Sequence, residues 1–253
     1  MSTDPWPGGY ARLHLAEVDS TQGEAARRLA ELPGPTWITT DRQTAGKGRR
    51  GRAWTSPPGN FAATLLLRPA EPPALAALRS FVASLALFDA FVAATGRTEP
   101  FALKWPNDVL LNGGKVAGIL LESLGQGQGQ GISHLAIGIG VNLTAAPPRE
   151  AVEAQALPPV SLLSETGAQV TPDEFLGLLA PAYARYETQL TTYGFGPIRE
   201  AWLARAARLG EVITARTAAE EITGTFETVD AGGNLVLSTA KSRRAIAAAE
   251  VFF

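Results

Sequence analysis

The stretch TAGKGRRGRAW, residues 44–54, places three glycines and four cations within eleven positions. The cations are Lys47, Arg49, Arg50 and Arg52. Glycines let backbone N–H groups turn toward a ligand, and guanidinium groups form charge-assisted hydrogen bonds with phosphates and carboxylates, of about 1.5–3 kcal/mol each. The stretch is therefore typical of an anion-binding loop. Without an anion the cations repel one another, so we expect the loop to be mobile when empty.

Other interpretations of this loop are weaker. Its Gly-x-Gly-x-x-Gly spacing matches a dinucleotide-binding fingerprint, but that motif must open a helix, and RAWTSPPGN after Gly51 predicts a turn. The acidic residue about twenty positions on, Glu71, does not end a second strand. A nucleic-acid patch would need interleaved aromatic residues, and only Trp54 is present nearby. A solvated basic hairpin and a nucleic-acid patch stay open as alternatives.

Three further stretches carry polar side chains among apolar neighbours: DSTQ, KWPNDVLLNGGKVAGIL and AIGIGVNL. The polar residues of interest in them are Ser20, Thr21, Lys104, Asn107, Asp108, Lys115 and Asn142. Each stretch also has an ordinary structural explanation, because a helix cap, a turn or close strand packing would place similar residues there. Glycines 138 and 140, which alternate with apolar residues, fit such close packing.

Composition bounds the functions that this chain can have. The 253 residues carry a net charge of −2 and include 45% apolar residues, as in an ordinary soluble globular protein with no general affinity for DNA or membranes. The absence of cysteine excludes disulfides, zinc thiolates and a cysteine nucleophile, and the presence of only two histidines argues against a multi-histidine metal site. No signal peptide is apparent. The apolar run within residues 81–94 is interrupted and too short for a bilayer, so we expect a cytoplasmic protein.

Helix and strand signals predict a body and a small appended module. We expect helices after Ser20, over residues 74–95, from Thr171 to about Leu190 and over residues 197–208. Thr21 with Glu24, and Thr171 with Glu174, have the pattern of a capping box. We expect strands at TWITTDRQ, FAATLLLRP, FALKW, DVLLN, KVAGILLES and HLAIGIGVNL, and a flexible hairpin connection at residues 125–131. From Leu209 on, the short β segments EVITART, EITGTFETVD and GNLVLST predict an all-β module.

The hairpins outnumber the strand–helix–strand units, so the pattern predicts an α+β fold with a mixed, mostly antiparallel sheet and flanking helices. Two domains follow from this pattern, over residues 1–208 and 209–253. Nothing in the sequence defines an interface between copies of the chain.

Taken in order along the chain, DST, GKGRRGRAW, KWPNDV, GGKVAGIL and GIGVNL resemble the signatures of the biotin protein ligases. The likeness covers nearly the whole chain. It implies a class II synthetase-like biotin/lipoate ligase catalytic domain over residues 1–208 and an SH3-like β-barrel over residues 209–253. It also implies an enzyme that uses ATP and Mg²⁺ to form biotinoyl-5′-AMP, and then transfers biotin to a lysine of a biotin carboxyl carrier protein.

The resemblance assigns roles to individual positions. Biotin would be bound by Ser20, Thr21, Gln22, Gln43, Gly46, Lys47, Gly48, Arg49, Lys115, Gly118 and Gly138. ATP would be bound by Arg49, Arg52, Trp54, Asn107, Asp108, Lys115 and Asn142. Lys115 and Arg49 would be catalytic, and Mg²⁺ would arrive on the ATP phosphates with help from Asp108. Two positions depart from the family pattern, since Lys47 stands for an arginine and Gln22 for a frequent asparagine.

Rival functions remain. A lipoate or octanoate ligase of the same superfamily is the nearest alternative, whereas a transferase with a cysteine nucleophile is excluded because the chain has no cysteine. A biotin-sensing repressor would need a DNA-binding domain, and the eighteen residues before Asp19 leave no room for one. We therefore expect biotin, ATP and a carrier protein as partners, with neither DNA nor membrane. The resemblance leaves a homodimer open.

Overall fold

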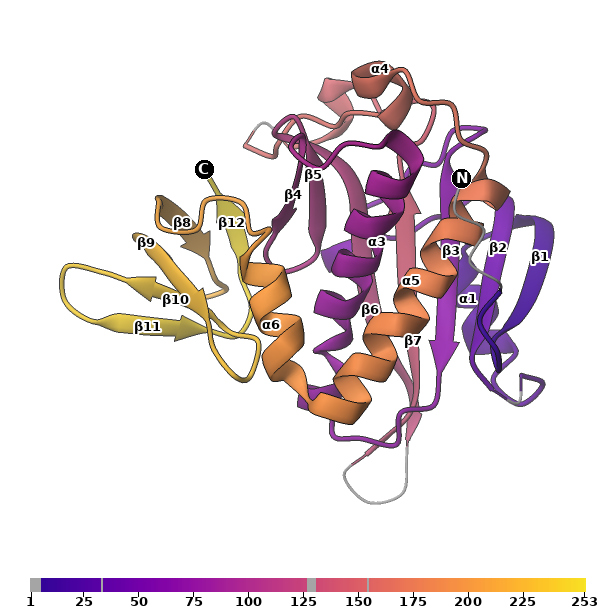
Figure 1. The fold of residues 1–253 in the computed structure, drawn as a ribbon, viewed down its shortest axis with the longest axis horizontal. Coiled ribbons are helices and arrows are strands. Elements are labelled where there is room, and N and C mark those ends of the chain that lie inside the picture. The colour runs from indigo at the N-terminus through magenta and orange to yellow at the C-terminus, as the bar shows by residue number, and fades with distance from the viewer. Residues whose placement is uncertain (1–5, 33, 127–130, 154) are drawn as a thin grey trace.

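The computed structural model of the protein describes residues 6–32, 34–126, 131–153 and 155–253. Its body is built on a seven-stranded sheet in the order β1-β2-β3-β7-β6-β5-β4 (Figure 1). The strands are β1 (Ala11–Val18), β2 (Thr36–Gln43), β3 (Phe61–Leu67), β4 (Phe101–Lys104), β5 (Asp108–Leu111), β6 (Gly114–Gln126) and β7 (Ile132–Val141). The β1–β2 pair is parallel and the other pairs are antiparallel. The predicted mixed, mostly antiparallel sheet is confirmed.

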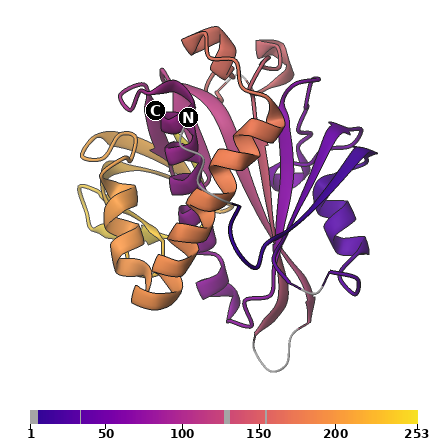
Figure 2. The ribbon, with the colours of Figure 1, turned by 45° about the vertical axis from the view of Figure 1, so that its right-hand side comes forward.

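The two faces of the sheet carry different helices. The helices of the body are α1 (Thr21–Arg27), α2 (Pro73–Ala76), α3 (Arg79–Thr95), α4 (Leu162–Thr166), α5 (Pro172–Tyr193) and α6 (Phe195–Leu203), with short 3₁₀ turns at Arg49–Gly51 and Arg149–Ala151. In Figures 1 and 2, α3 and α5 cover one face and α1 lies on the other. Strand alternation explains the division, because Trp37 on β2 joins the core under α3 and α5, whereas its neighbour Ile38 packs with Ala25 of α1.

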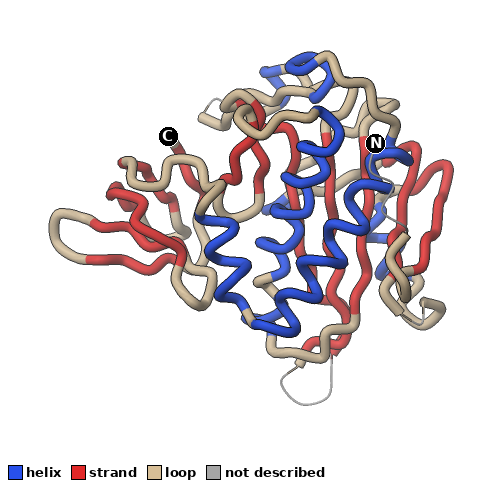
Figure 3. The backbone as a smooth tube through the Cα atoms, viewed as in Figure 1, coloured by secondary structure: helices blue, strands red, loops and turns tan. Residues whose placement is uncertain are grey.

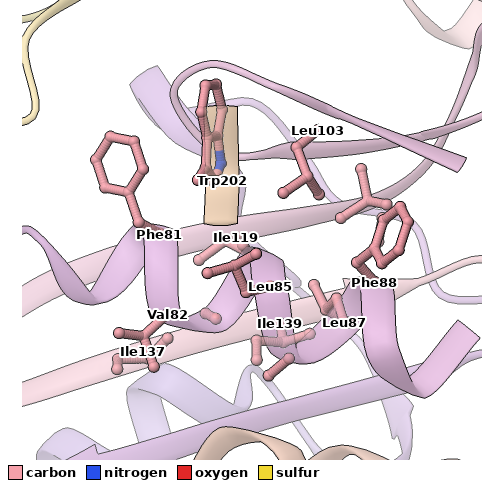
Figure 4. Close-up of a cluster of buried hydrophobic side chains, with 14 of the residues drawn as sticks. Phe81, Val82, Leu85, Leu87, Phe88, Leu103, Ile119, Ile137, Ile139 and Trp202 are labelled. Atoms are coloured by element: carbon pink, nitrogen blue, oxygen red, sulfur yellow. The ribbon is translucent and has the colours of Figure 1, made fainter. Parts of the chain in front are cut away.

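The main core lies between α3 and the central strands. Figure 4 shows Phe81, Val82 and Leu85 of α3 packed against isoleucines of β6 and β7, all of them buried. The helical stretch Pro73–Thr95 has 23 residues and is long and apolar enough to cross a membrane, but 78% of its apolar window is buried inside the protein. The apolar run within residues 81–94 is part of this longer helical stretch, and its burial in the core explains its apolar composition.

Helix boundaries confirm some capping signals and correct others. Thr171 and Glu174 form the predicted capping box at the start of α5. At α1 the cap is Ser20, whose hydroxyl accepts from the Gly23 N–H at 3.0 Å, so the predicted box of Thr21 with Glu24 is wrong. Ser20 is the cap because it directly precedes the first helical residue and its own backbone is extended. Helix α6 ends at Leu203, earlier than the predicted residue 208.

The C-terminal residues form a separate five-stranded antiparallel sheet in the order β11-β10-β9-β8-β12. Its strands are β8 (Val212–Arg216), β9 (Glu221–Val229), β10 (Leu235–Ser238), β11 (Arg243–Ile246) and β12 (Glu250–Phe252). Figure 3 shows this sheet beside α6, away from α1. The sequence predicted β8–β10 but not β11 or β12, because β11 is mostly exposed, with two arginines among its four residues, and β12 has only three residues. The predicted connection at residues 125–131 falls largely on residues 127–130, outside the described residues.

Candidate active site

A cavity of about 470 Å³ lies where α1, the loop after β2, the β4–β7 strands and β12 meet. The sequence-predicted residues that line it are Ser20, Thr21, Gln22, Gln43, Lys47, Gly48, Arg49, Arg52, Trp54, Asn107, Asp108, Lys115, Gly118, Gly138 and Asn142. Gly46 does not line the cavity. It packs so closely against the Trp54 carbonyl that a side chain would not fit, and a Cβ at this position would lie 2.8 Å from Gln43 Nε2. The fold thus brings together residues from segments more than 120 positions apart.

One end of the cavity presents neutral hydrogen-bonding groups, and we call it the neutral end. Gln43 at the end of β2 accepts from the Thr21 N–H at 2.9 Å and from the Thr21 hydroxyl at 3.2 Å. Thr64 of β3, which no sequence signal identified, donates to the Thr21 hydroxyl at 2.8 Å. These contacts fix the polar groups at the mouth of α1 against the sheet. They can therefore recognise a small polar ring system with little rearrangement.

Two glycines on β7 leave space for larger side chains on the cavity face of the sheet. A Cβ at position 138 would lie 2.8 Å from the Gln22 side chain, and one at position 140 would overlap the Trp54 indole. Gln22 donates to the Leu120 carbonyl at 3.1 Å, which holds it across Gly138. The interpretation of these glycines as close-packing positions is therefore correct, and it also explains how the cavity is shaped.

The other end carries positive charge, and we call it the cationic end. Lys115 Nζ lies 2.7 Å from Asp108 Oδ1, and Lys104 Nζ lies 3.9 Å from Asp108 Oδ2. Burial alone would raise the pKa of Asp108, but Lys115 and Lys104 outweigh burial and hold it below its ordinary value. Burial lowers the pKa of Lys104 despite the attraction of Asp108. The two lysines share one carboxylate, so this end keeps an excess of positive charge.

Two asparagines and Arg49 also line the cavity, and Arg49 reaches the C-terminal module. Arg49 donates to Asn107 Oδ1 at 3.2 Å and to the Ala249 carbonyl at 3.4 Å, and burial lowers its pKa. Asn107 in turn donates to the Ile119 carbonyl at 2.5 Å. Asn142 donates to the Val160 carbonyl at 3.0 Å, while its buried Oδ1 has no hydrogen-bond partner among the described residues. That free acceptor suits an N–H or O–H group of a ligand.

The glycine- and arginine-rich loop folds into a small hairpin over the cavity. The Gly48 N–H donates to the Arg52 carbonyl at 2.7 Å, and the Trp54 N–H donates to the Gly46 carbonyl at 2.9 Å. The 3₁₀ turn is followed by extended chain, which agrees with rejecting the dinucleotide fingerprint. Trp54 then lies under the hairpin, with Lys115 Nζ 5.6 Å from its ring centroid.

Glu250 on β12 holds this hairpin from the C-terminal module. It accepts from Arg50 at 2.8 Å and from Arg52 at 2.6 Å and 3.1 Å. The hydrogen bond from Arg52 lowers the pKa of Glu250. The chain itself therefore supplies an anion to two of the four loop cations, which the sequence expectation of mutual repulsion did not include. No sequence signal identified Glu250, because it lies some 200 positions from its partners.

Within the described ranges, no group of three or more acidic, histidine or cysteine side chains could hold a metal ion. Asp108 remains a carboxylate that faces the cavity next to Lys115.

Comparison with known proteins identifies the family. Residues 15–142 match the Biotin/lipoate A/B protein ligase family, and residues 209–253 match the Biotin protein ligase C terminal domain. A biotin--[acetyl-CoA-carboxylase] ligase of Paracoccus denitrificans is 58% identical over 239 residues, which cover 94% of this chain and 99% of that protein. This chain belongs to the biotin protein ligase family.

Other members of the biotin protein ligase family extend the likeness. A bifunctional ligase/repressor of Bacillus spizizenii is 31% identical over 96% of this chain and 74% of its own length. The structure of a biotin protein ligase from Aquifex aeolicus in complex with biotin and ATP superposes with a TM-score of 0.82 at 28% identity, and covers 95% of this chain and 97% of that one. The predicted biotin ligase fold, with its β module at the C-terminal end, is thereby confirmed.

Proposed function

We propose that this chain is an ATP-dependent biotin protein ligase. In this reaction biotin is activated to biotinoyl-5′-AMP and then transferred to a lysine of a biotin carboxyl carrier protein. The observation that carries the proposal is one cavity that has a neutral end and, around Lys115 and Asp108, a cationic end. Such a cavity matches a small neutral ring system that continues into a carboxylate and a phosphate.

The neutral end is proposed to bind the ureido ring of biotin. Thr21 and Gln43 are already held by mutual hydrogen bonds, and Ser20 at the helix cap lies beside them. Gly118 and Gly138 have no side chains of their own, and we propose that their backbone borders the ring beside the side chains that pack there, Lys115 and Trp54 at Gly118 and Gln22 at Gly138. Gln22, which lies across Gly138, stands where the family often has asparagine, and we propose that its amide borders the ring.

The nucleotide is proposed to lie along the other wall. The unpartnered Oδ1 of Asn142 supports an adenosine contact there. Trp54 offers an aromatic face for adenine, and Asn107 next to Arg49 offers an amide for the ribose or phosphate. We propose that Lys47 and Arg52 of the hairpin face the phosphates, with Gly46 and Gly48 setting the shape of the loop. For Arg52 this requires exchange of its contacts with Glu250 and Glu153 for phosphate oxygens.

In the first step a carboxylate oxygen of biotin attacks the α-phosphorus of ATP, and the bond from that phosphorus to the bridging oxygen of the leaving group breaks. Pyrophosphate leaves with the bonding electron pair. Two anions must approach each other, so catalysis is mainly charge compensation and positioning. We propose that Lys115 bridges the carboxylate and the α-phosphate while Arg49 covers the acyl phosphate. Mg²⁺ carried by the ATP phosphates would supply further charge neutralisation, with Asp108 as the carboxylate of the cavity that could assist in holding it.

In the second step the ε-amine of the carrier lysine attacks the acyl carbon of biotinoyl-5′-AMP. An amide bond forms, AMP leaves with the electron pair of the broken anhydride bond, and the amine releases a proton. Lys115 would stabilise the charge that develops on the acyl and phosphate oxygens. The hairpin excludes water from the anhydride, and we propose that the module over residues 209–253 contributes by holding that hairpin through Glu250.

The experiment that tests this function is ATP–pyrophosphate exchange with purified protein. Exchange should depend on biotin, and lipoate at the same concentration should not replace it. Exchange driven by lipoate alone would instead establish the lipoate ligase alternative. The proposed carrier is tested by adding a biotin-accepting carrier domain and following the acceptor lysine by mass spectrometry.

A further inference from the structure

Lys104 is a buried lysine at the end of β4 to which the mechanism above gives no role. Its side chain is 10% exposed, and it lines the cavity. Its recorded neighbours among the described residues are Asp108, at 3.9 Å, and the ring of Phe253, whose centroid lies 5.7 Å from Nζ. A lysine with so little exposure is rarely kept without an anion that compensates the loss of water.

The local charges leave Lys104 without a full partner. Asp108 already makes its short contact with Lys115 through Oδ1, and Lys104 approaches Oδ2 beyond hydrogen-bond range. Two ammonium groups therefore share one carboxylate. Glu250, the next acidic residue along this wall, is engaged by Arg50 and Arg52 of the hairpin. The cluster is built to receive a further anion from outside the chain.

Strand order shows where along the substrate that anion would lie. The neutral end is formed by β2, β3 and β7, and the next strands across the sheet are β6, β5 and β4. Lys115 is on β6, Asp108 on β5 and Lys104 at the end of β4. Neighbouring strands lie about 4.8 Å apart, so Lys104 lies roughly two strands beyond Lys115, farther from the neutral end.

We propose that Lys104 binds the β- and γ-phosphates of ATP and stabilises pyrophosphate as it leaves. This inference rests on the proposed function, in which Lys115 contacts the carboxylate and the α-phosphate. When the bond between the α-phosphorus and the bridging oxygen breaks, the electron pair stays on that oxygen, and the Lys104 ammonium offsets the added charge with no proton transfer. Lys104 then serves adenylate formation and has no contact with the group that the carrier lysine attacks.

The test separates the two half-reactions in Lys104→Met. Lys241→Met is the matched control, because Lys241 is exposed in the turn between β10 and β11. In biotin-dependent ATP–pyrophosphate exchange we expect Lys104→Met to raise the KM for pyrophosphate about tenfold to a hundredfold, the range for loss of one charged hydrogen bond. Transfer from preformed biotinoyl-5′-AMP to the carrier domain should stay within about twofold of the parent. Lys104→Arg should restore part of the pyrophosphate affinity.

Two results would overturn the inference. Unchanged exchange kinetics in Lys104→Met would show that no phosphate contact is made. The second result is that Lys104→Met loses exchange activity and transfer activity from preformed adenylate to the same extent, and that Asp108→Asn shows the same two losses. Lys104 would then act only by positioning Asp108. Because burial disfavours the charged form of Lys104, we expect Lys104→Met to fold, and circular dichroism checks this.

Failure of the proposed function gives a different result. The parent would then show no biotin-dependent exchange at all. In that case pyrophosphate binding is measured directly by calorimetry with magnesium pyrophosphate. If the parent and Lys241→Met bind pyrophosphate equally well and Lys104→Met binds it more weakly, the Lys104 site is still supported. Equal binding by all three proteins contradicts it.

Discussion

Replacing Asp108 by Asn removes the carboxylate that lies between two lysines at the cationic end of the cavity. At an effective dielectric constant of about 20, the attraction to Lys115 at 2.7 Å is about 6 kcal/mol, and the attraction to Lys104 at 3.9 Å is about 4 kcal/mol. Desolvation of the carboxylate offsets much of this sum. Removing one partner of a buried ion pair costs about 3–5 kcal/mol, because the remaining charge stays buried.

We therefore expect Asp108→Asn to lower the free energy of unfolding by about 3 kcal/mol or more. For a chain of this size each kcal/mol lowers Tm by about 2–4 °C, so Tm should fall by at least about 6 °C. The matched control is Asp41→Asn, since the Asp41 side chain is 69% exposed beside His14 and its loss should change stability by no more than about 0.5 kcal/mol. Thermal and urea unfolding followed by circular dichroism measure both variants.

A second substitution tests the cause of the loss. Lys115→Met removes one of the ammonium groups that Asp108→Asn leaves unpaired, so the double variant should be more stable than Asp108→Asn alone. The pKa of Asp108 lies below its ordinary value of 3.8 in the folded protein. Its contribution is therefore fully present above about pH 3.8 and is lost as the pH falls through the lower folded pKa, so parent and variant should converge in acid.

The reasoning is refuted if Asp108→Asn unfolds within about 1 kcal/mol of the parent near neutral pH. It is also refuted if Lys115→Met destabilises the Asp108→Asn protein further by as much as it destabilises the parent.

Three further predictions concern catalysis and the cavity. Lys115→Ala should nearly abolish adenylate formation while the fold stays intact. The measurement is the amount of biotinoyl-5′-AMP formed in a single turnover, and formation at the parental rate would contradict the assignment. Arg49→Ser should release adenylate into solution, which chromatography of free biotinoyl-5′-AMP detects, and unchanged retention argues against a covering role. Gly140→Ala should displace Trp54 and raise the KM for ATP about tenfold or more while biotin affinity changes little. Equal loss of ATP and biotin affinity would contradict the assignment of Trp54 to the adenine.

The local motifs could be predicted from sequence because each is a run of neighbouring residues with a clear chemical character. The strand from Thr36 to Gln43, the capped start of α5 and the turn after Gly51 all follow from residue order alone. The grouping of Lys115, Asp108 and Asn107 in one cavity could be expected as well, because Asp108 and Lys115 lie on paired strands and Asn107 directly precedes Asp108.

The remaining features depend on contacts between distant segments. Glu250 binds the hairpin across about 200 positions, and Thr64 supports Thr21 across 43. Neither has an unusual neighbourhood in the sequence. The sequence predicted Thr21 as the cap of α1, whereas the cap is Ser20 and the Thr21 hydroxyl hydrogen-bonds Gln43 and Thr64 of the sheet. Such choices are made by tertiary packing, which residue patterns alone do not encode.

The central claim is tested most directly by incubating the purified protein with biotin, ATP, Mg²⁺ and a biotin-accepting carrier domain, and measuring the intact mass of the carrier. The account predicts a gain of one biotinoyl group on the acceptor lysine, dependent on ATP and absent with Lys115→Ala. A carrier that stays unmodified, or one modified equally by the Lys115→Ala protein, would contradict it.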